Sequence, residues 1–167
     1  MARDAAGGGV SSLPSLGSRG EGWVAIQGVL LVAEAAAGLA GPMIDGGVRV
    51  GLAVVGLVAI GLGGLLAVRG VVDLREALTP LPHPRDGASL VETGSYRLVR
   101  HPIYGGLVLG AAGYGLLAAS PLAIAGSAVL LGFFRLKSAR EEAWLEARYP
   151  GYDAYRARTR RMIPFLY

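Results

Sequence analysis

Residues 91–104 carry the side chains of this sequence that are best suited to bind a ligand or take part in a reaction. They include two arginines, a histidine and two tyrosines, and an apolar run, residues 105–119, follows directly. His101, with Tyr96 and Tyr104 nearby, is suited to hydrogen bonding with a polar cofactor. Because these polar groups lie at the edge of an apolar segment, they predict a site that serves both a water-soluble and a lipophilic molecule.

Simpler interpretations of the same residue types stay open. Arg100 and Pro102 are also typical of a basic helix start, with the proline in the first turn and the arginine among lipid head groups. Glu141 and Glu142 can form a solvated helix face. Their position near Lys137 equally suits them to hold an ammonium or sulfonium ligand, or to anchor the neighbouring cations.

The composition predicts a membrane protein. Of the 167 residues, 53% are hydrophobic and only 17% are charged, with a mean hydropathy of +0.49. A soluble domain of this size cannot bury so much apolar surface. The chain has no cysteine and only two histidines, which excludes disulfides, thiolate metal sites and a cysteine nucleophile, and argues against a metal centre.

Four apolar segments position the chemical residues. They are residues 23–40, 48–68, 103–119 and 122–134. The first two carry about the 20 residues that cross a bilayer core, whereas the last two are shorter and should form a tight helical hairpin. The sequence therefore predicts an all-α, polytopic membrane protein with about four transmembrane helices.

Segments outside the membrane complete the predicted fold. Residues 79–87 contain three prolines within five positions, which forbids a helix and favours a stiff connector. Residues 135–149 are strong helix formers that end before a Pro-Gly pair, so we expect a cytoplasmic C-terminal helix. Residues 1–22 are rich in glycine and serine and predict a flexible tail, which leaves 23–167 as one membrane domain.

Basic residues predict the orientation of the chain. Of the 16 Lys and Arg, only Arg49 falls in the loops on one side of the four segments, and all the others fall on the opposite side. The positive-inside rule makes that opposite side cytoplasmic, so we expect both termini in the cytoplasm of a cell-membrane protein. The basic tail, residues 152–161, predicts contact with anionic membrane lipid rather than nucleic acid, because the predicted topology already accounts for basic residues on this side of the membrane.

Glu34 is an ionisable residue within the first apolar segment. Such a carboxylate is costly in lipid and is therefore a functional candidate. Gln27, seven residues earlier on the same helix face, is a possible partner. A structural pairing with Arg69 or Arg49 is the alternative, and the residues alone do not decide between the two.

An ordered set of short motifs resembles one known family. The motifs are Leu78-Thr79-Pro80-Leu81-Pro82, Leu90-Val91 with Gly94 and Tyr96, Arg100-His101-Pro102-Ile103-Tyr104 followed by Gly106, Phe133-Phe134-Arg135, Glu141-Glu142, Tyr152 with Tyr155, and Ile163-Pro164. In this order, over roughly residues 50–167, they resemble the isoprenylcysteine carboxyl methyltransferase family, which is related to phospholipid methyltransferases.

The resemblance implies a helical membrane enzyme that uses S-adenosylmethionine, with a cytoplasmic cofactor pocket built from residues 79–104 and 135–167. Carried over by position, the residues implied to bind the cofactor are Ala88, Ser89, Leu90, Val91, Tyr96, His101, Pro102, Ile103, Tyr104 and Glu141. Lys137 and Arg100 are implied to face the substrate. Lys137 stands where the family tends to have an arginine, which keeps the charge and loses the bidentate fork.

We therefore expect methyl transfer from S-adenosylmethionine to a small or lipophilic acceptor, such as a carboxylate, a thiol or a lipid head group. Such a transfer requires no metal. Two other functions stay open: a non-catalytic membrane binding or assembly protein of the same fold, and a small transporter with Glu34 as its proton carrier. Neither the acceptor nor the oligomeric state can be inferred from the sequence.

Overall fold

The structure, a computed structural model, describes residues 13–40, 43–84 and 86–164. Its elements are α1 (Glu21–Ala40), α2 (Val48–Leu74), η1 (Arg75–Ala77), η2 (Gly94–Arg97), α3 (Pro102–Leu117), α4 (Pro121–Arg148) and α5 (Tyr152–Arg158), where η marks a short 3-10 helix. The only β pairing in these residues is an isolated bridge between Val99 and Arg160. The described chain is all-α, as the sequence predicts.

Three of these helices, α1, α2 and α4, are long and apolar enough to cross a membrane, and α3 is a shorter apolar helix. They coincide with the four predicted segments, so the chain is a polytopic integral membrane protein. The helix expected after residue 134 is continuous with the fourth segment and forms the last turns of α4. No proline or glycine interrupts residues 133–149, which gives the backbone no reason to break there.

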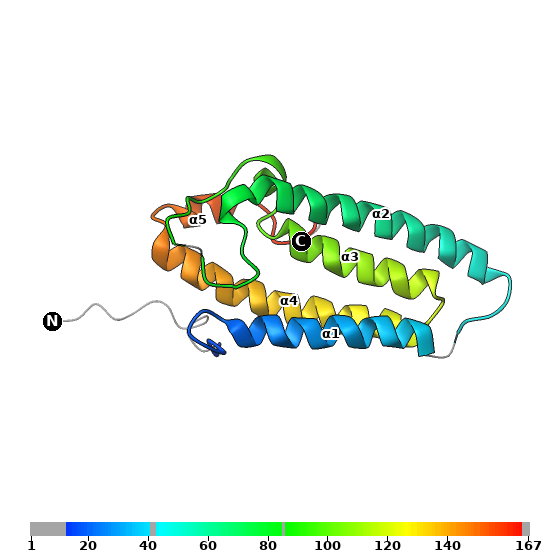
Figure 1. The fold of residues 1–167 in the computed structure, drawn as a ribbon. Helices are drawn as coiled ribbons and strands as arrows, with labels where there is room; N and C mark the ends of the chain where they lie inside the picture. The colour runs from blue at the N-terminus through cyan, green and yellow to red at the C-terminus, as the bar shows by residue number, and fades with distance from the viewer. Residues whose placement is uncertain (1–12, 41–42, 85, 165–167) are drawn as a thin grey trace.

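The membrane helices associate in antiparallel pairs (Figure 1). α2 packs most extensively on α3, and α4 packs on both α3 and α1. Glycines bring α2 and α3 close together: a Cβ added at Gly63 would lie 2.6 Å from the main-chain oxygen of Gly106, and one at Gly56 would lie 2.6 Å from the main-chain nitrogen of Leu117. Small residues at this interface allow the backbones to touch, which gives close van der Waals packing in lipid.

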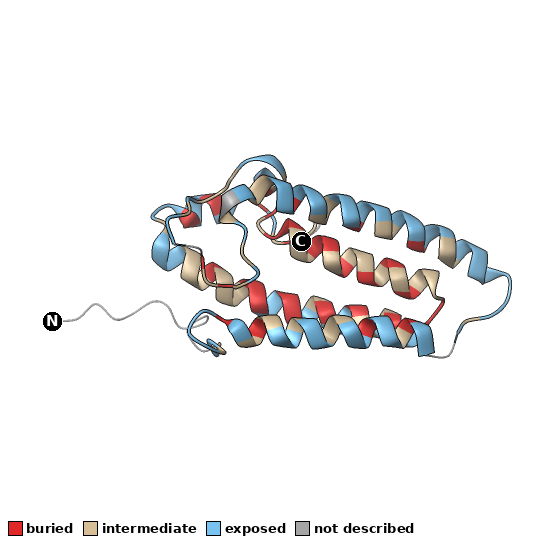
Figure 2. Cartoon of the chain, viewed as in Figure 1, coloured by how far each residue is buried: buried red, intermediate tan, exposed pale blue. Residues whose placement is uncertain are grey.

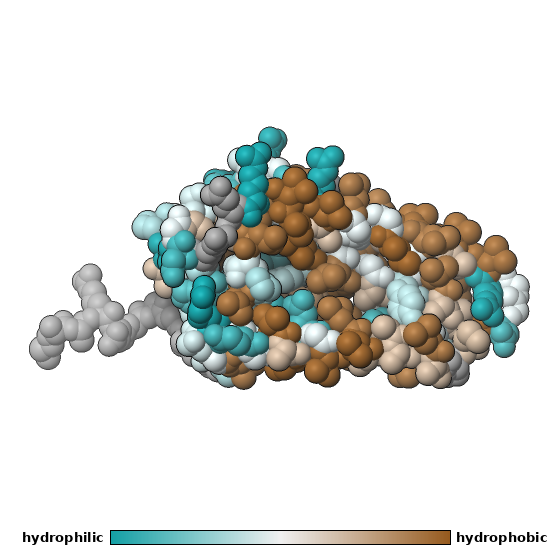
Figure 3. All heavy atoms as spheres, viewed as in Figure 1, coloured by the Kyte–Doolittle hydropathy of each residue, from teal (hydrophilic) through white to brown (hydrophobic). Residues whose placement is uncertain are grey.

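Apolar side chains cover the outside of the bundle as well as its core. Buried residues concentrate along α3 and α4, while much of α2 faces outward (Figure 2). The outward residues of α2 are largely valines and leucines, such as Val55, Leu62 and Val68, each more than half exposed. The visible face of the bundle is accordingly hydrophobic along its length and polar at the end that holds α5 (Figure 3). An apolar exterior of this kind is suited to lipid.

The polar end of the bundle is built from segments that are far apart in sequence. The proline-rich connector after η1 runs there without regular structure, as predicted, and η2 packs on the end of α2. The Ser95 main-chain nitrogen and hydroxyl both donate to Asp73 Oδ2 at 2.7 Å, which fixes η2 to that helix. The Val99–Arg160 bridge then ties the chain before α3 to the chain after α5.

Residues 1–12 of the predicted flexible tail lie outside the described residues. The chain just before α1 packs on that helix, where Trp23 Nε1 donates to the main-chain oxygen of Pro14 at 3.2 Å.

Glu34 is the acidic residue in the membrane part of α1. Glu34 is buried against Gly126 of α4, and neither of its carboxylate oxygens has a hydrogen-bond partner. Gln27 instead accepts a hydrogen bond from Lys137, so none of the partners considered for Glu34 pairs with it.

Candidate functional site

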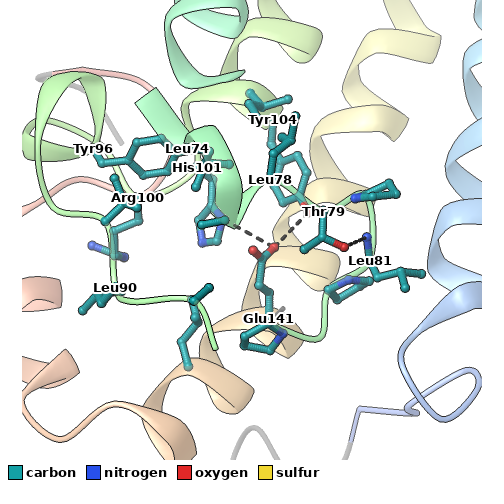
Figure 4. Close-up of a pocket in the computed structure, with 18 of the residues that line it drawn as sticks. Leu74, Leu78, Thr79, Leu81, Leu90, Tyr96, Arg100, His101, Tyr104 and Glu141 are labelled. Carbon is teal, nitrogen blue, oxygen red and sulfur yellow. Dashed lines mark hydrogen bonds and ion pairs between the residues drawn. The ribbon is translucent and has the colours of Figure 1, made fainter. Parts of the chain in front are cut away.

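A cavity of about 360 Å³ lies at the polar end of the bundle (Figure 4). Its walls come from the connector, η2, the start of α3, the last turns of α4, and α5, with contributions from α1 and the end of α2. Of the residues implied by the resemblance, the structure places these on the wall: Ala88, Ser89, Leu90, Val91, Tyr96, Arg100, His101, Ile103, Tyr104, Lys137 and Glu141. Pro102 is fully buried at the first turn of α3 and does not line the cavity.

The irregular connector is held in place by side chains of α4. The Tyr149 hydroxyl donates to the main-chain oxygen of Ala88 at 2.7 Å. The ring of His83 meets that of Trp144 edge-on, with centroids 5.5 Å apart. Because prolines deny this segment a helix, such contacts satisfy its polar groups and fix its path around the cavity.

Glu141 is the acidic group that faces the cavity. The Tyr104 hydroxyl donates to Glu141 Oε2 at 2.8 Å, and His101 Nδ1 lies 3.8 Å from the same oxygen. The rings of His101 and Tyr104 stack with centroids 5.4 Å apart. In Figure 4 the carboxylate of Glu141 points toward both rings across the cavity. This oriented carboxylate is suited to attract a cationic ligand, and one of its oxygens remains without a protein donor among the contacts of the described residues.

Glu142, one residue later, does not line the cavity and accepts hydrogen bonds in a buried network. Its side chain is 3% exposed, and Arg100 Nε donates to its Oε1 at 2.9 Å. His101 Nε2 lies 3.0 Å from the same oxygen and donates to it, because a carboxylate can only accept. Arg161 donates to Oε2 at 3.3 Å. This buried network joins α4 to the chain just before α3 and just after α5, and it fixes the orientation of the His101 ring.

Lys137 lies one turn before Glu141 on α4 and is almost fully buried. Its ammonium donates to Gln27 Oε1 at 2.6 Å and to the main-chain oxygen of Pro80 at 3.4 Å, and it lies 5.2 Å from the centroid of the Tyr104 ring. All of these partners are neutral. The cavity therefore has a cation on the side of α1 and an anion on the side of α3.

Three buried tyrosines outside the membrane helices also line the cavity: Tyr96, Tyr152 and Tyr155. Burial raises the pKa of each phenol well above its ordinary value, so all three remain protonated donors at neutral pH. The Tyr155 hydroxyl donates to the main-chain oxygen of Tyr96 at 2.8 Å. The Tyr152 hydroxyl is buried and has no partner within the described chain, which leaves a donor available for a ligand.

Several residues of the cavity wall do not appear among the site residues predicted from the sequence. Gln27 comes from α1, and an apolar group comes from the end of α2 and the turn after it: Val71, Leu74, Ala77 and Leu78. Leu78 belongs to a motif of the resemblance but was not predicted to line the site, and the other three residues lack any signal, because in sequence they only continue an apolar segment. For Gln27 a signal existed, since an amide within a membrane helix needs a partner, yet it indicated Glu34 instead of Lys137.

The arrangement is suited to bind an elongated ligand with polar and apolar parts. Its volume falls within the range of small-molecule sites, and its charged groups lie at separate places on an otherwise apolar and aromatic wall. Within the described residues no group of three His, Asp or Glu is placed to hold a metal ion.

Comparisons with known proteins show the family of the chain. The sequence model of a family described as phospholipid methyltransferase matches residues 52–151, which include α2, α3, α4 and the connector. Proteins of Oryza sativa subsp. indica and subsp. japonica, each named probable protein-S-isoprenylcysteine O-methyltransferase, are 31% identical to the chain over 116 residues. That match covers 67% of this chain and 61% of each relative, so the chain spans less than two thirds of their length. On the extent of the family match, this chain belongs to the phospholipid methyltransferase family.

Proposed function

We propose that the chain is an integral membrane methyltransferase that uses S-adenosylmethionine and methylates a small or lipophilic acceptor at the cytoplasmic face. The observation that carries the proposal is the cavity at the polar end of the bundle, with Glu141 and His101 together on its wall. Membership of the phospholipid methyltransferase family supports the reaction class.

The residues present fit the cofactor. S-adenosylmethionine has a sulfonium and an ammonium, which Glu141 can attract, and a carboxylate and a ribose, which need donors. The unpartnered Tyr152 hydroxyl is such a donor. The apolar side chains of Leu90 and Ile103 also line the cavity and offer a surface for a purine ring. Each charged part of the cofactor therefore has a counterpart on the wall.

The acceptor side is assigned to the cavity wall near α1 and α2. Within the described residues the hydrogen bonds of Lys137 go to neutral oxygens, so its charge is available to an anionic acceptor group such as a carboxylate or thiolate. Val71 and Leu74 of α2 line the same cavity beside the lipid-facing surface, which suits an acceptor with an apolar chain. Arg100 also lines the cavity, but its Nε donates to Glu142 and its Nη1 to the main-chain oxygens of Arg156 and Thr159, and we assign it to holding the wall.

In the mechanism, bound S-adenosylmethionine would supply an electrophilic methyl group, which would pass to the acceptor as the bond between this methyl group and the sulfur breaks and the neutral thioether leaves. Glu141 orients the positive end of the cofactor, and His101 and Tyr104 hold the Glu141 carboxylate in place. The apolar wall excludes water, and Lys137 positions the acceptor anion for in-line attack, so proximity and desolvation supply much of the acceleration. A carboxylate or thiolate acceptor is already an anion and needs no general base.

The direct test is transfer of a labelled methyl group by the purified chain in lipid. The acceptors offered are a prenylated cysteine, a thiol and a phospholipid extract, and the methylated product is identified by mass spectrometry. We expect transfer to at least one acceptor and a loss of at least about 100-fold for Glu141→Gln or His101→Ala. The matched control, Glu146→Gln, changes an exposed carboxylate of the same helix and should retain activity.

Binding, methyl transfer and transport, measured on the same variants, separate the two rival functions from the enzyme. A non-catalytic binding protein would bind the cofactor without turnover of the label. A proton-coupled transporter would lose its activity on Glu34→Gln and keep it on His101→Ala, which is the reverse of what the enzyme predicts. The transporter is retained as a candidate because the carboxylate of Glu34 is buried and has no hydrogen-bond partner within the described residues.

A further inference from the structure

A second hollow, of about 250 Å³, lies outside the cavity described above. It is lined by Arg97, Leu98, Arg158 and Arg160, none of which lines the first cavity. Three guanidinium groups around one hollow are an unusual concentration of positive charge. Arginine binds phosphate groups through paired N–H donors more effectively than lysine does.

Main-chain hydrogen bonds bring these arginines together from two distant segments. The Arg160 main-chain nitrogen donates to the Leu98 oxygen at 3.0 Å, and the Arg100 nitrogen donates to the Arg160 oxygen at 2.9 Å. These bonds flank the Val99–Arg160 bridge. The hollow therefore has a fixed base, and side-chain substitutions at its arginines leave that base intact.

The charge of the hollow is only partly neutralised by the protein. Arg158 pairs with Glu92. Neither Arg97 nor Arg160 has a carboxylate within ion-pair distance in the described part of the chain, and both are exposed. Two guanidinium groups are therefore available to an external anion, and they lie on the basic side of the molecule.

The hollow lies at the edge of the apolar exterior. It continues directly from η2, which packs on the end of α2 through Asp73. Leu98, on the wall of the hollow, is 49% exposed, and Val72 at the end of α2 is 60% exposed. An anion bound here would therefore have its charge at the arginines and an apolar surface beside it, which matches a lipid better than a soluble phosphate.

We propose that the Arg97–Arg160 hollow binds the phosphate of an anionic phospholipid head group, with the acyl chains of that lipid along Leu98 and the end of α2. The site holds the polar end of the protein against the membrane surface and does not depend on catalysis. Each arginine at an anionic membrane surface strengthens binding by a similar increment, so both are needed for full affinity.

The experiment is a titration of the full chain in neutral detergent with short-chain phosphatidylglycerol, followed by native mass spectrometry of bound lipid. We expect the double variant Arg97→Gln with Arg160→Gln to bind phosphatidylglycerol about 30-fold more weakly than the unmodified chain. Short-chain phosphatidylcholine should bind both proteins alike. The control is Arg49→Gln, which removes one exposed arginine from the opposite end of α2 and should bind as the unmodified chain does.

Two outcomes would overturn the proposal. The first is equal phosphatidylglycerol binding by the double variant and the unmodified chain, with thermal unfolding showing that both are folded. The second is displacement of the lipid by inorganic phosphate at equal concentration, because a site for free phosphate gains nothing from the apolar surface. Methyl transfer is measured separately on the same proteins, so failure of the lipid site and failure of the proposed reaction are distinguishable.

Discussion

Two adjacent glutamates of α4 have opposite surroundings. Glu141 faces the cavity and accepts one hydrogen bond from Tyr104, while Glu142 is buried among Arg100, His101 and Arg161. Adjacent residues of a helix point about 100° apart, so one acid can serve a ligand and the other the structure. The sequence marks both as a pair, and only the packing of the segment before α3 and of the chain after α5 separates their roles.

Glu142→Gln should destabilise the protein strongly. The change leaves the guanidinium of Arg100 and the neighbouring Arg161 without their buried counter-charge, which costs roughly 3–5 kcal/mol. Thermal unfolding in detergent measures the effect. Glu146→Gln on the exposed side of the same helix, where Glu146 pairs with Arg156, should cost less than about 1 kcal/mol. Similar unfolding midpoints for the two variants would mean that the network does not stabilise the fold.

Tyr152→Phe should weaken cofactor binding without loss of stability. The hydroxyl of Tyr152 has no protein partner, so its removal breaks no bond within the described chain. If it donates to the cofactor, its loss weakens binding by about fivefold, the effect of one ordinary hydrogen bond. Calorimetric titration with S-adenosylmethionine measures this.

Tyr155→Phe is the matched comparison. It removes a hydroxyl that does have a partner, the main-chain oxygen of Tyr96, and should therefore lower stability by about 1 kcal/mol. Unchanged affinity in Tyr152→Phe would exclude the hydroxyl as a ligand donor. The two variants together distinguish a hydroxyl that binds a ligand, that of Tyr152, from a hydroxyl that stabilises the cavity wall, that of Tyr155.

At the scale of elements, close glycine contacts decide how α2 meets α3. A Cβ added at Gly63 would lie 2.6 Å from the Gly106 oxygen and 2.7 Å from the Gly110 nitrogen, both main-chain atoms that cannot move aside alone. Gly63→Ala should therefore force the helices apart and cost about 1–3 kcal/mol, measured as a lower unfolding midpoint. Gly64→Ala is the control, because a Cβ there has nothing within 4 Å. Equal effects at both positions would show that helix propensity, not contact, governs these glycines.

The elements were largely predictable because their signals are local. Apolar length defines the four helices, and Pro121 with the Ser120 cap, which accepts from the Ala123 nitrogen at 3.3 Å, fixes where α4 begins. The sequence predicts a helix over residues 135–149 but treats it as a separate element, because the fall in apolarity after residue 134 suggested a boundary. A helix ends at a breaker or a cap, and a change of polarity supplies neither.

The candidate site was predictable in part and for a different reason. Motif order placed His101 and Glu141 together, and the structure brings them within 3.8 Å. The contribution of Gln27 was not predictable, because its contact with Lys137 joins residues that are 110 positions apart. Such a contact depends on how α1 packs on α4, which no local pattern encodes.

At the scale of the whole molecule, orientation determines which compartment supplies the cavity. The segments that line the cavity, with α5 and the last turns of α4, lie at one end of the bundle, and residues 43–47 and the turn between α3 and α4 lie at the other (Figure 1). The basic residues of the described chain other than Arg49 belong to the first end. The positive-inside rule predicts that the basic end lies in the cytoplasm. S-adenosylmethionine is a polar cytoplasmic metabolite, so the proposed function requires that orientation.

The absence of cysteine from the sequence makes orientation directly measurable. Asp45→Cys introduces a thiol into the exposed loop before α2, and Asp153→Cys introduces one on the exposed side of α5. In intact cells, a membrane-impermeant maleimide should label the first variant, and it should label the second only after the membrane is permeabilised. The unmodified chain should not be labelled under either condition. Labelling of Asp153→Cys in intact cells would place the cavity outside the cytoplasm, where the cofactor is not made, and would remove the physical basis for methyl transfer even if the isolated protein bound S-adenosylmethionine.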